Sequence, residues 1–428
     1  MDKIGKRNLK VFSVGAALND IGARMYDSYL PFFAAIFLGV TPVQYGVIEG
    51  IGEAVNRIFR LFTGYFSDLI GRKVPVILGY IIISLSRLGL PLVSGWAGFI
   101  PFRALRQVGR SLRDPALEAS IAESVPQPEH GRAFGILNAI DTIGSVFGPF
   151  IGLLVLYWAA VGVSASDSSG VVLTIWTGIK TSFPRESYTW LFFCAALPSV
   201  ISAWIIYLFL YETKMPLEPK TPADAKAPKK QDSFSIFTFI SSLKSGSPLR
   251  DLGKITLSHM ILSMGAIPIA MILLYAYKDL SASVIEGMIL GISYALAQFL
   301  SAYPAGWLSD RIGRFRTQLA ANSLLILALL ITIVVRQPLL LIFPLILYGI
   351  FDSIWTTNRR AAISDLAGKE SFGRTLGNFS ALYGFTSLIC PILFGAIWSS
   401  TSSGWAFFIA ALFPAAAMVM LIKNNKTR

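Results

Sequence analysis

The chain has 428 residues, of which 54% are hydrophobic and only 14% are charged, and its formal net charge is +13. Its mean hydropathy is +0.62. A soluble globular chain would carry nearly twice this share of charged residues, so the composition argues against soluble domains and for a protein embedded in lipid.

Apolar residues recur along the chain in segments of about 20 residues or more, the length that an α-helix needs to cross about 30 Å of hydrocarbon. Within that layer a helix satisfies all of its own backbone polar groups. We therefore predict an all-α membrane protein with twelve spans. In chain order they cover residues 11–37, 43–66, 74–94, 96–124, 132–160, 188–211, 251–276, 283–308, 316–335, 338–362, 373–398 and 403–422.

The positively charged residues lie almost entirely in alternate loops of this layout. They precede the first span, follow the second and the eighth, and occupy residues 212–250, whereas the loops at 38–42, 94–96 and 399–403 carry no charge. Lysine and arginine are retained on the cytoplasmic side of membranes. We therefore predict a multi-pass protein of the cell membrane with both termini in the cytoplasm. We expect no nucleic-acid partner, because the positive charge follows the topology.

An internal repeat divides the chain into two halves. The sequence GYFSDLIGR at residues 64–72 returns as GWLSDRIGR at 306–314, and GRAFG at 131–135 matches GRTLG at 373–377, both with a shift of 242 residues. The repeat predicts an N-terminal six-helix bundle at residues 1–211, a cytoplasmic linker at 212–250 and a C-terminal six-helix bundle at 251–428.

The first of these repeated segments suits a conformational switch. Its glycines permit tight turns, and an aspartate and an arginine four residues apart can pair with helix ends in one arrangement of the bundle and release them in another. A loop that only satisfies the topology is the alternative. The candidate switch residues are Gly64, Asp68, Gly71, Arg72, Gly306, Asp310, Gly313 and Arg314.

This loop resembles the signature of the major facilitator superfamily, and it stands at both places where that family carries it. The first copy departs from the family pattern at Phe66 and Leu69, while the second, with Leu308 and Arg311, is closer to it. The resemblance covers essentially the whole chain. It implies two six-helix bundles, a central cavity near the bilayer midplane, alternating access by rocking of the bundles, and a monomer.

Ionisable residues form stripes inside the predicted spans of the first half, where each is costly unless it is paired or solvated. Mutual neutralisation is one interpretation of these residues, and contact with substrate is the other. A carboxylate in a poorly solvated place can bind a proton near neutral pH and thereby couple transport to a proton gradient. The proton-coupling candidates are Asp27 and Glu53, followed by Asp20, Glu118 and Asp141. The substrate-cavity candidates are Arg24, Arg57, Arg103, Arg106, Arg110, Asp114 and His259, the last of which could equally be a packing residue.

Span 5 carries small or bending residues at regular spacing, at Gly135, Gly144, Gly148, Pro149 and Gly152. This spacing permits close helix contact and a bend where the bundle must seal, although ordinary tight packing also explains it. In the family resemblance, the span is similar to the motif of proton-coupled exporters, without its final glycine. The resemblance also implies that Arg103 is the family's basic residue of proton transfer.

The leading hypothesis is a secondary active transporter that exports small amphiphilic compounds in exchange for protons. The alternative is a carrier of an anionic nutrient or metabolite, because buried arginines could clamp a carboxylate or a phosphate. A sensor or scaffold would be favoured by a large soluble domain, which the sequence does not show. No phosphate-binding Gly-Lys loop, His-rich metal pattern or nucleophile elbow is present, so we expect no enzyme activity, no metal and no cofactor beyond the proton gradient.

Overall fold

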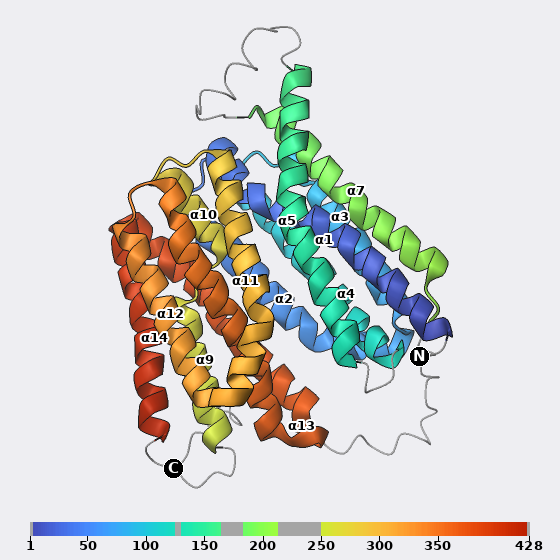
Figure 1. The fold of residues 1–428 in the computed structure, drawn as a ribbon. Helices are drawn as coiled ribbons and strands as arrows, with labels where there is room; N and C mark the ends of the chain where they lie inside the picture. Colours follow the sequence, from blue (N-terminus) through green and yellow to red (C-terminus); the bar gives the residue numbers. More distant parts are fainter. Residues whose placement is uncertain (1–2, 125–129, 164–182, 213–249, 426–428) are drawn as a thin grey trace.

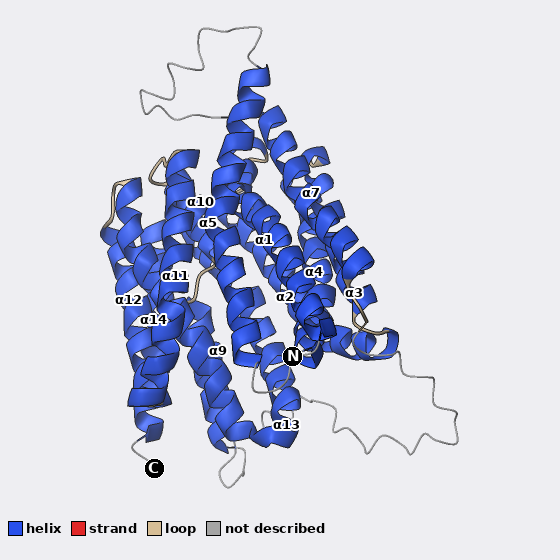
Figure 2. Cartoon of the chain, turned by 45° about the vertical axis from the view of Figure 1, so that its right-hand side comes forward, coloured by secondary structure: helices blue, strands red, loops and turns tan. Residues whose placement is uncertain are grey.

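The computed structural model describes residues 3–124, 130–163, 183–212 and 250–425 (Figure 1). Figure 2 shows that the described chain is helical, with no strand, which confirms the predicted all-α class. The helices of the first half are α1 (Lys3–Phe37), α2 (Pro42–Ile70), α3 (Lys73–Leu88), α4 (Trp96–Ser124), α5 (His130–Val163) and α7 (Arg185–Phe209). Those of the second half are α9 (Arg250–Gly265), α10 (Ile269–Lys278), α11 (Val284–Ile312), α12 (Arg314–Val334), α13 (Ile342–Ser400) and α14 (Ser403–Asn425). Short 3₁₀ turns lie at Leu90–Leu92 and Pro338–Leu341.

The two halves form two bundles that lie side by side, blue to green and yellow to red in Figure 1. Among the described residues, six helices make up the first bundle. In the second bundle α9 and α10 form one interrupted span, and α13 contains two predicted spans, so this half also provides six. The predicted pair of six-helix bundles is thereby confirmed.

Two details of the second half differ from the prediction. The span predicted at 251–276 is interrupted between Gly265 and Ile269, because Pro268 has no backbone N–H and disfavours helical geometry in the residue before it. The spans predicted at 338–362 and 373–398 are joined, since α13 remains helical through residues 363–372. A straight helix of its 59 residues would be about 90 Å long, and Figure 1 shows the ribbon of α13 turning at its lower end instead.

The helices differ in how well they suit a lipid environment. Seven helical segments of the described chain are long and apolar enough to cross a membrane, and α7, α11, α12 and α14 are among them. The helices α1, α2 and α4 do not qualify, because charged residues such as Arg24, Glu53 and Arg106 interrupt their apolar stretches. A charged side chain at membrane depth must face the protein interior or a water-filled cavity. These three helices therefore have to line the inside of the fold.

The two bundles touch at the end of the molecule that lies opposite both termini. The Phe32 ring of α1 meets the Tyr277 ring of α10 edge-on, with ring centroids 5.7 Å apart. Gly46 of α2 lies directly against the backbone of Pro391 on α13, so closely that an added Cβ atom would overlap it. Toward the termini the ribbons of the two bundles diverge in Figure 1, and the side chain of Tyr303 on α11 is largely exposed. The bundles are thus sealed against each other at one end.

Candidate functional site

Charged residues of α1, α2 and α4 form a buried network inside the first bundle. The Arg103 guanidinium lies 2.5 Å from a carboxylate oxygen of Glu49 and 3.5 Å from one of Asp27. The Arg106 guanidinium lies 2.6 Å from the other oxygen of Asp27 and 4.7 Å from the ring centroid of Tyr26. Arg103, Arg106 and Glu49 are nearly inaccessible, whereas the Asp27 side chain is 37% exposed. Asp27 is therefore the most exposed member of this network.

Glu53 lies one helical turn along α2 from Glu49 and has different partners. Its carboxylate lies 3.6 Å from the Arg57 guanidinium and accepts a hydrogen bond of 3.3 Å from the Gln107 amide. Because Glu53 and Arg57 are four residues apart, both side chains lie on one face of the helix. Glu53, like Asp27, is a partly exposed carboxylate held beside an arginine.

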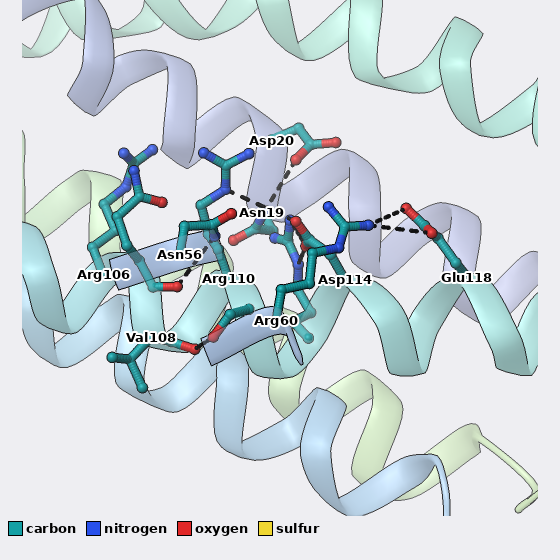
Figure 3. Close-up of polar contacts among 12 residues, drawn as sticks. Asn19, Asp20, Asn56, Arg60, Arg106, Val108, Arg110, Asp114 and Glu118 are labelled. Atoms are coloured by element: carbon teal, nitrogen blue, oxygen red, sulfur yellow. Dashed lines mark hydrogen bonds and ion pairs between the residues drawn. The ribbon is translucent and has the colours of Figure 1, made fainter. Parts of the chain in front are cut away.

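A second group of ion pairs continues along α4 (Figure 3). The Arg113 guanidinium lies 2.6 Å from Asp114, and Arg110 lies 4.0 Å from the same carboxylate. Arg60 of α2 lies 3.3 Å from Glu118, and both of these side chains are well exposed. Water screens exposed charges, so such a pair contributes at most about 1 kcal/mol to stability. Glu118 therefore belongs to an exposed ion pair, whereas Asp114 lies between two arginines.

Small and bending residues bring α5 against the charged face of α1. The motif residues that make this contact are Gly144, Gly148, Pro149 and Gly152. A Cβ atom on Gly144 would lie 2.9 Å from the Cβ atom of Asp20, and one on Gly148 would lie 2.6 Å from that of Arg24. The Tyr29 hydroxyl donates a hydrogen bond of 2.5 Å to the Pro149 carbonyl. The predicted span-5 motif thus lies at the α1–α5 contact, beside two of the candidate charged residues.

A pocket of about 280 Å³ lies between the two bundles, near the lower end of the range of roughly 300–1000 Å³ that is usual for ligand sites. From the first bundle it is lined by Glu49, Glu53 and Arg57. From the second bundle it is lined by α11, α13 and the interruption between α9 and α10 at residues 266–268. Irregular backbone at membrane depth is tolerated where it lines a cavity or is buried in protein. The pocket is therefore the natural place for a solute between the bundles.

Two acidic residues on this pocket were not selected by the sequence reasoning, Glu49 and Asp352. Asp352 of α13 accepts hydrogen bonds from the Tyr294 hydroxyl at 2.8 Å and from the Gln298 amide at 2.5 Å. The sequence did hold a signal for it, because an acid near the middle of a predicted span is costly without a partner or a function. Of the predicted cavity residues, Arg57 lines the pocket itself, and Arg103 contacts it only through Glu49.

His259 is buried beside Trp355, which lines the pocket. The Trp355 indole N–H donates a hydrogen bond of 3.1 Å to Nδ1 of His259. His259 itself is not among the residues that line the described pocket. In this structure it holds a wall of the pocket in position.

The two repeated loops hold helix ends together through their arginines. In the first, Arg72 pairs with Glu123 of α4 at 2.8 Å, and its backbone N–H donates a hydrogen bond of 2.9 Å to Glu212. In the second, Arg314 pairs with Asp310 at 2.7 Å. The first loop thus joins α2 and α3 to distant segments, whereas the Arg314–Asp310 pair of the second loop spans the turn between α11 and α12.

Glycine is required at the turn of each loop. Gly71 has φ 89° and Gly313 has φ 85°, a region that side chains other than glycine rarely adopt. Gly306 lies within α11. The remaining predicted residues, Gly64, Asp68, Gly135 and Asp141, belong to helices but lie outside the residues whose side chains are described.

Metal binding finds no support in the described part of the chain. There, no group of three or more His, Cys, Asp or Glu side chains is placed to hold an ion. The arrangement can instead hold and exchange charge, because carboxylates and arginines face one another at and behind a pocket between the two bundles.

Comparison with known proteins places this geometry in context. The family model described as the Major Facilitator Superfamily matches residues 12–261 and 255–428. An uncharacterized MFS-type transporter of Methanocaldococcus jannaschii is 26% identical over 407 residues, covering 93% of this chain and 90% of that protein. The multidrug resistance protein MdtG of Salmonella dublin is 25% identical over 430 residues, covering 93% of this chain and 95% of MdtG.

Solved structures share the fold at low sequence identity. A bacterial homolog of the human lysosomal transporter Spinster, in an inward-facing and unoccupied conformation, has a TM-score of 0.74 at 14% identity, covering 100% of this chain and 98% of that one. A POT family transporter in complex with 5-aminolevulinic acid has a TM-score of 0.75 at 12% identity, covering 97% and 95%. These likenesses concern the arrangement of the helices alone.

Proposed function

The chain belongs to the Major Facilitator Superfamily, and from this premise we propose that it is a proton-driven antiporter that exports small amphiphilic compounds. It works as a monomer in the cell membrane, with both termini in the cytoplasm and the proton gradient as its driving force. Alternating access follows from rocking of the two bundles, which are sealed at one end and diverge at the other. The pocket between them would then open to each side of the membrane in turn.

The observation that carries this proposal is that two partly exposed carboxylates, Glu53 at the pocket and Asp27 in the buried network behind Glu49, each lie within reach of an arginine. Glu53 faces the pocket next to Arg57, and Asp27 takes Arg106 as its partner. A proton that binds either carboxylate removes its negative charge and frees the arginine to change partner. Release of that proton on the other side of the membrane restores the ion pair. Such an exchange links proton occupancy to the arrangement of the bundles.

The arginine pairs also weigh against the anion carrier. Arg57 and Arg103 each have a carboxylate within 4 Å, and Arg106 shares Asp27 with Arg103. An anionic cargo would have to displace a carboxylate that is already in place, which costs the ion pair it replaces. The similarity to MdtG, which is named as a multidrug resistance protein, agrees with export of amphiphilic compounds.

Transport in proteoliposomes with an imposed pH gradient and an internal pH dye tests the proposal. We expect a lipophilic cation to drive proton flux in the wild type, and Asp27→Asn and Glu53→Gln to reduce that flux at least about tenfold, as loss of an essential proton-transfer group does. Glu186→Gln is the matched control, because this exposed glutamate of α7 lies away from the pocket. Gradient-independent exchange of organic anions that survives both Asp27→Asn and Glu53→Gln would establish the anion carrier instead.

A further inference from the structure

We infer that Asp352 is the anchor for the cationic group of the cargo, and that the cargo is an organic ammonium ion with a small aromatic or apolar body. The inference rests on the proposed transport function and names the class of solute that occupies the same pocket. It also assigns the binding of cargo charge to the second bundle, whereas the proton-coupling carboxylates lie in the first.

The balance of charge around the pocket carries the argument. Glu49 is bound by Arg103 at 2.5 Å, and Glu53 lies 3.6 Å from Arg57. The partners of Asp352 among the described residues are instead neutral, the Tyr294 hydroxyl and the Gln298 amide. Once the ion pairs of the first bundle are taken into account, one negative charge remains at the pocket wall. A monovalent cation is the complement of that wall.

Arg359, seven residues along α13 from Asp352, does not occupy this position. Its guanidinium lies over the Trp355 ring, 4.9 Å from the ring centroid. No ion pair joins Arg359 to Asp352 in the described part of the chain. The pocket side of the carboxylate is therefore left to a ligand.

Aromatic side chains build the walls around Asp352. Trp355 stacks on Phe351 with an interplanar angle of 10° and donates its indole hydrogen bond to His259, so its ring is fixed from two sides. The Tyr348 hydroxyl donates to the Ile267 carbonyl at 2.8 Å, which fixes a second ring at the pocket. Aromatic faces attract organic cations through the negative potential of the ring, and they pack well against flat apolar groups. Phe351 and Arg359 already lie against the Trp355 ring, so the rings offered to a cargo are those of Tyr294 and Tyr348, which also line the pocket. The pocket thus offers a carboxylate and aromatic surfaces at the same place.

The interruption between α9 and α10 adds further oxygen atoms to this wall. Ala266 lines the pocket and Met264 lies close to it in the chain, and their carbonyls accept the weak thiol donor of Cys390 at 3.7 and 3.3 Å. A carbonyl oxygen has two lone pairs, so these groups can still accept hydrogen bonds from an ammonium N–H. The interruption brings the negative end of the α9 dipole and the positive end of the α10 dipole to the same place, so the two dipoles oppose each other. The carbonyl oxygens favour a cation over an anion.

The test is equilibrium binding to the purified full-length protein in lipid nanodiscs, measured by isothermal titration calorimetry. The probes are 2-phenylethylammonium, its neutral analogue 2-phenylethanol and the anion 3-phenylpropanoate. We expect the wild type to bind the ammonium ion at least about tenfold more tightly than the alcohol. Asp352→Asn should weaken ammonium binding by about 10- to 100-fold, the effect of losing a charge-assisted contact, and leave alcohol binding unchanged. Asp352→Glu should keep the preference, and Asp279→Asn at the exposed end of α10 is the matched control.

Undiminished ammonium binding by a folded Asp352→Asn protein would overturn the inference, as would a wild type that prefers the anion or does not distinguish the ammonium ion from the alcohol. If Asp352→Asn does not fold, two other measurements test the inference. The wild type should bind the ammonium ion more tightly than the alcohol, and Asp352→Glu should keep this preference. Failure of the proposed function looks different. Binding that depends on Asp352 without any proton flux in vesicles would refute the antiport and leave the cation site standing.

Discussion

The ion pair between Arg103 and Glu49 offers a sharp test of how charge is held inside the first bundle. Its two side chains are only 8% and 4% exposed, and the guanidinium and carboxylate lie 2.5 Å apart. Arg103→Met would leave the Glu49 carboxylate buried without its ion-pair partner, while Asp27 would keep Arg106 at 2.6 Å. Removing one member of a buried pair costs about 3–5 kcal/mol of unfolding free energy. We expect a loss of this size.

The chain provides a matched control on the same two helices. Arg60 and Glu118 also join α2 to α4, at 3.3 Å, but their side chains are 41% and 53% exposed. Water already screens this pair, so Arg60→Met should cost at most about 1 kcal/mol. Reversible unfolding by SDS in mixed micelles measures both changes in free energy on the purified protein.

A double substitution separates the cost of an orphaned charge from the value of the pair. Arg103→Met combined with Glu49→Leu removes both charges, and apolar side chains of similar size often replace a buried ion pair with little loss of stability. We expect the double variant to be more stable than Arg103→Met alone. Equal losses for Arg103→Met and Arg60→Met, or a double variant that loses the sum of its single substitutions, would refute the reasoning.

Further substitutions test the close helix contacts. Gly148→Val would drive its side chain into the backbone and Cβ of α1 near Arg24, so it should lower the free energy of unfolding by about 1–3 kcal/mol in the same SDS assay, whereas Gly148→Ala should cost less. Gly46→Val would push α2 away from Pro391 of α13, so we expect it to separate the two bundles at the end where they touch. The measurement is the distance between one spin label on each bundle at that end, which should increase. An unchanged distance would show that the Gly46–Pro391 contact does not hold that end closed. Asn358→Leu would remove buried hydrogen bonds of 2.8 Å to Ser309 of α11 and 3.0 Å to Gln318 of α12. We expect it to lower the free energy of unfolding by about 1–3 kcal/mol, measured by thermal unfolding. An unchanged free energy of unfolding would show that these bonds make no net contribution to stability.

The helical class, the two-fold repeat and the approximate spans followed from the sequence alone. Each of these depends on local properties of the chain, since apolar length sets a membrane helix and the positions of Lys and Arg set its orientation. The span predicted at 251–276 is present, but its helix is interrupted at residues 266–268, for which Pro268 was the local signal. The two spans predicted within α13 are separate apolar stretches of one element, which stays helical through residues 363–372 and turns between them (Figure 1).

The partners of the charged residues were decided only by the tertiary structure. Helical periodicity placed Asp27, Glu49 and Arg103 on polar faces, but it could not tell which arginine would reach which carboxylate, because that choice depends on how α1, α2 and α4 pack. Asp352 became a pocket residue in the same way. It lines the same pocket as Glu53 although the two residues belong to different halves of the chain. Sequence fixes what a helix can bury, whereas packing between distant helices decides which buried charges are paired and which are left for a ligand.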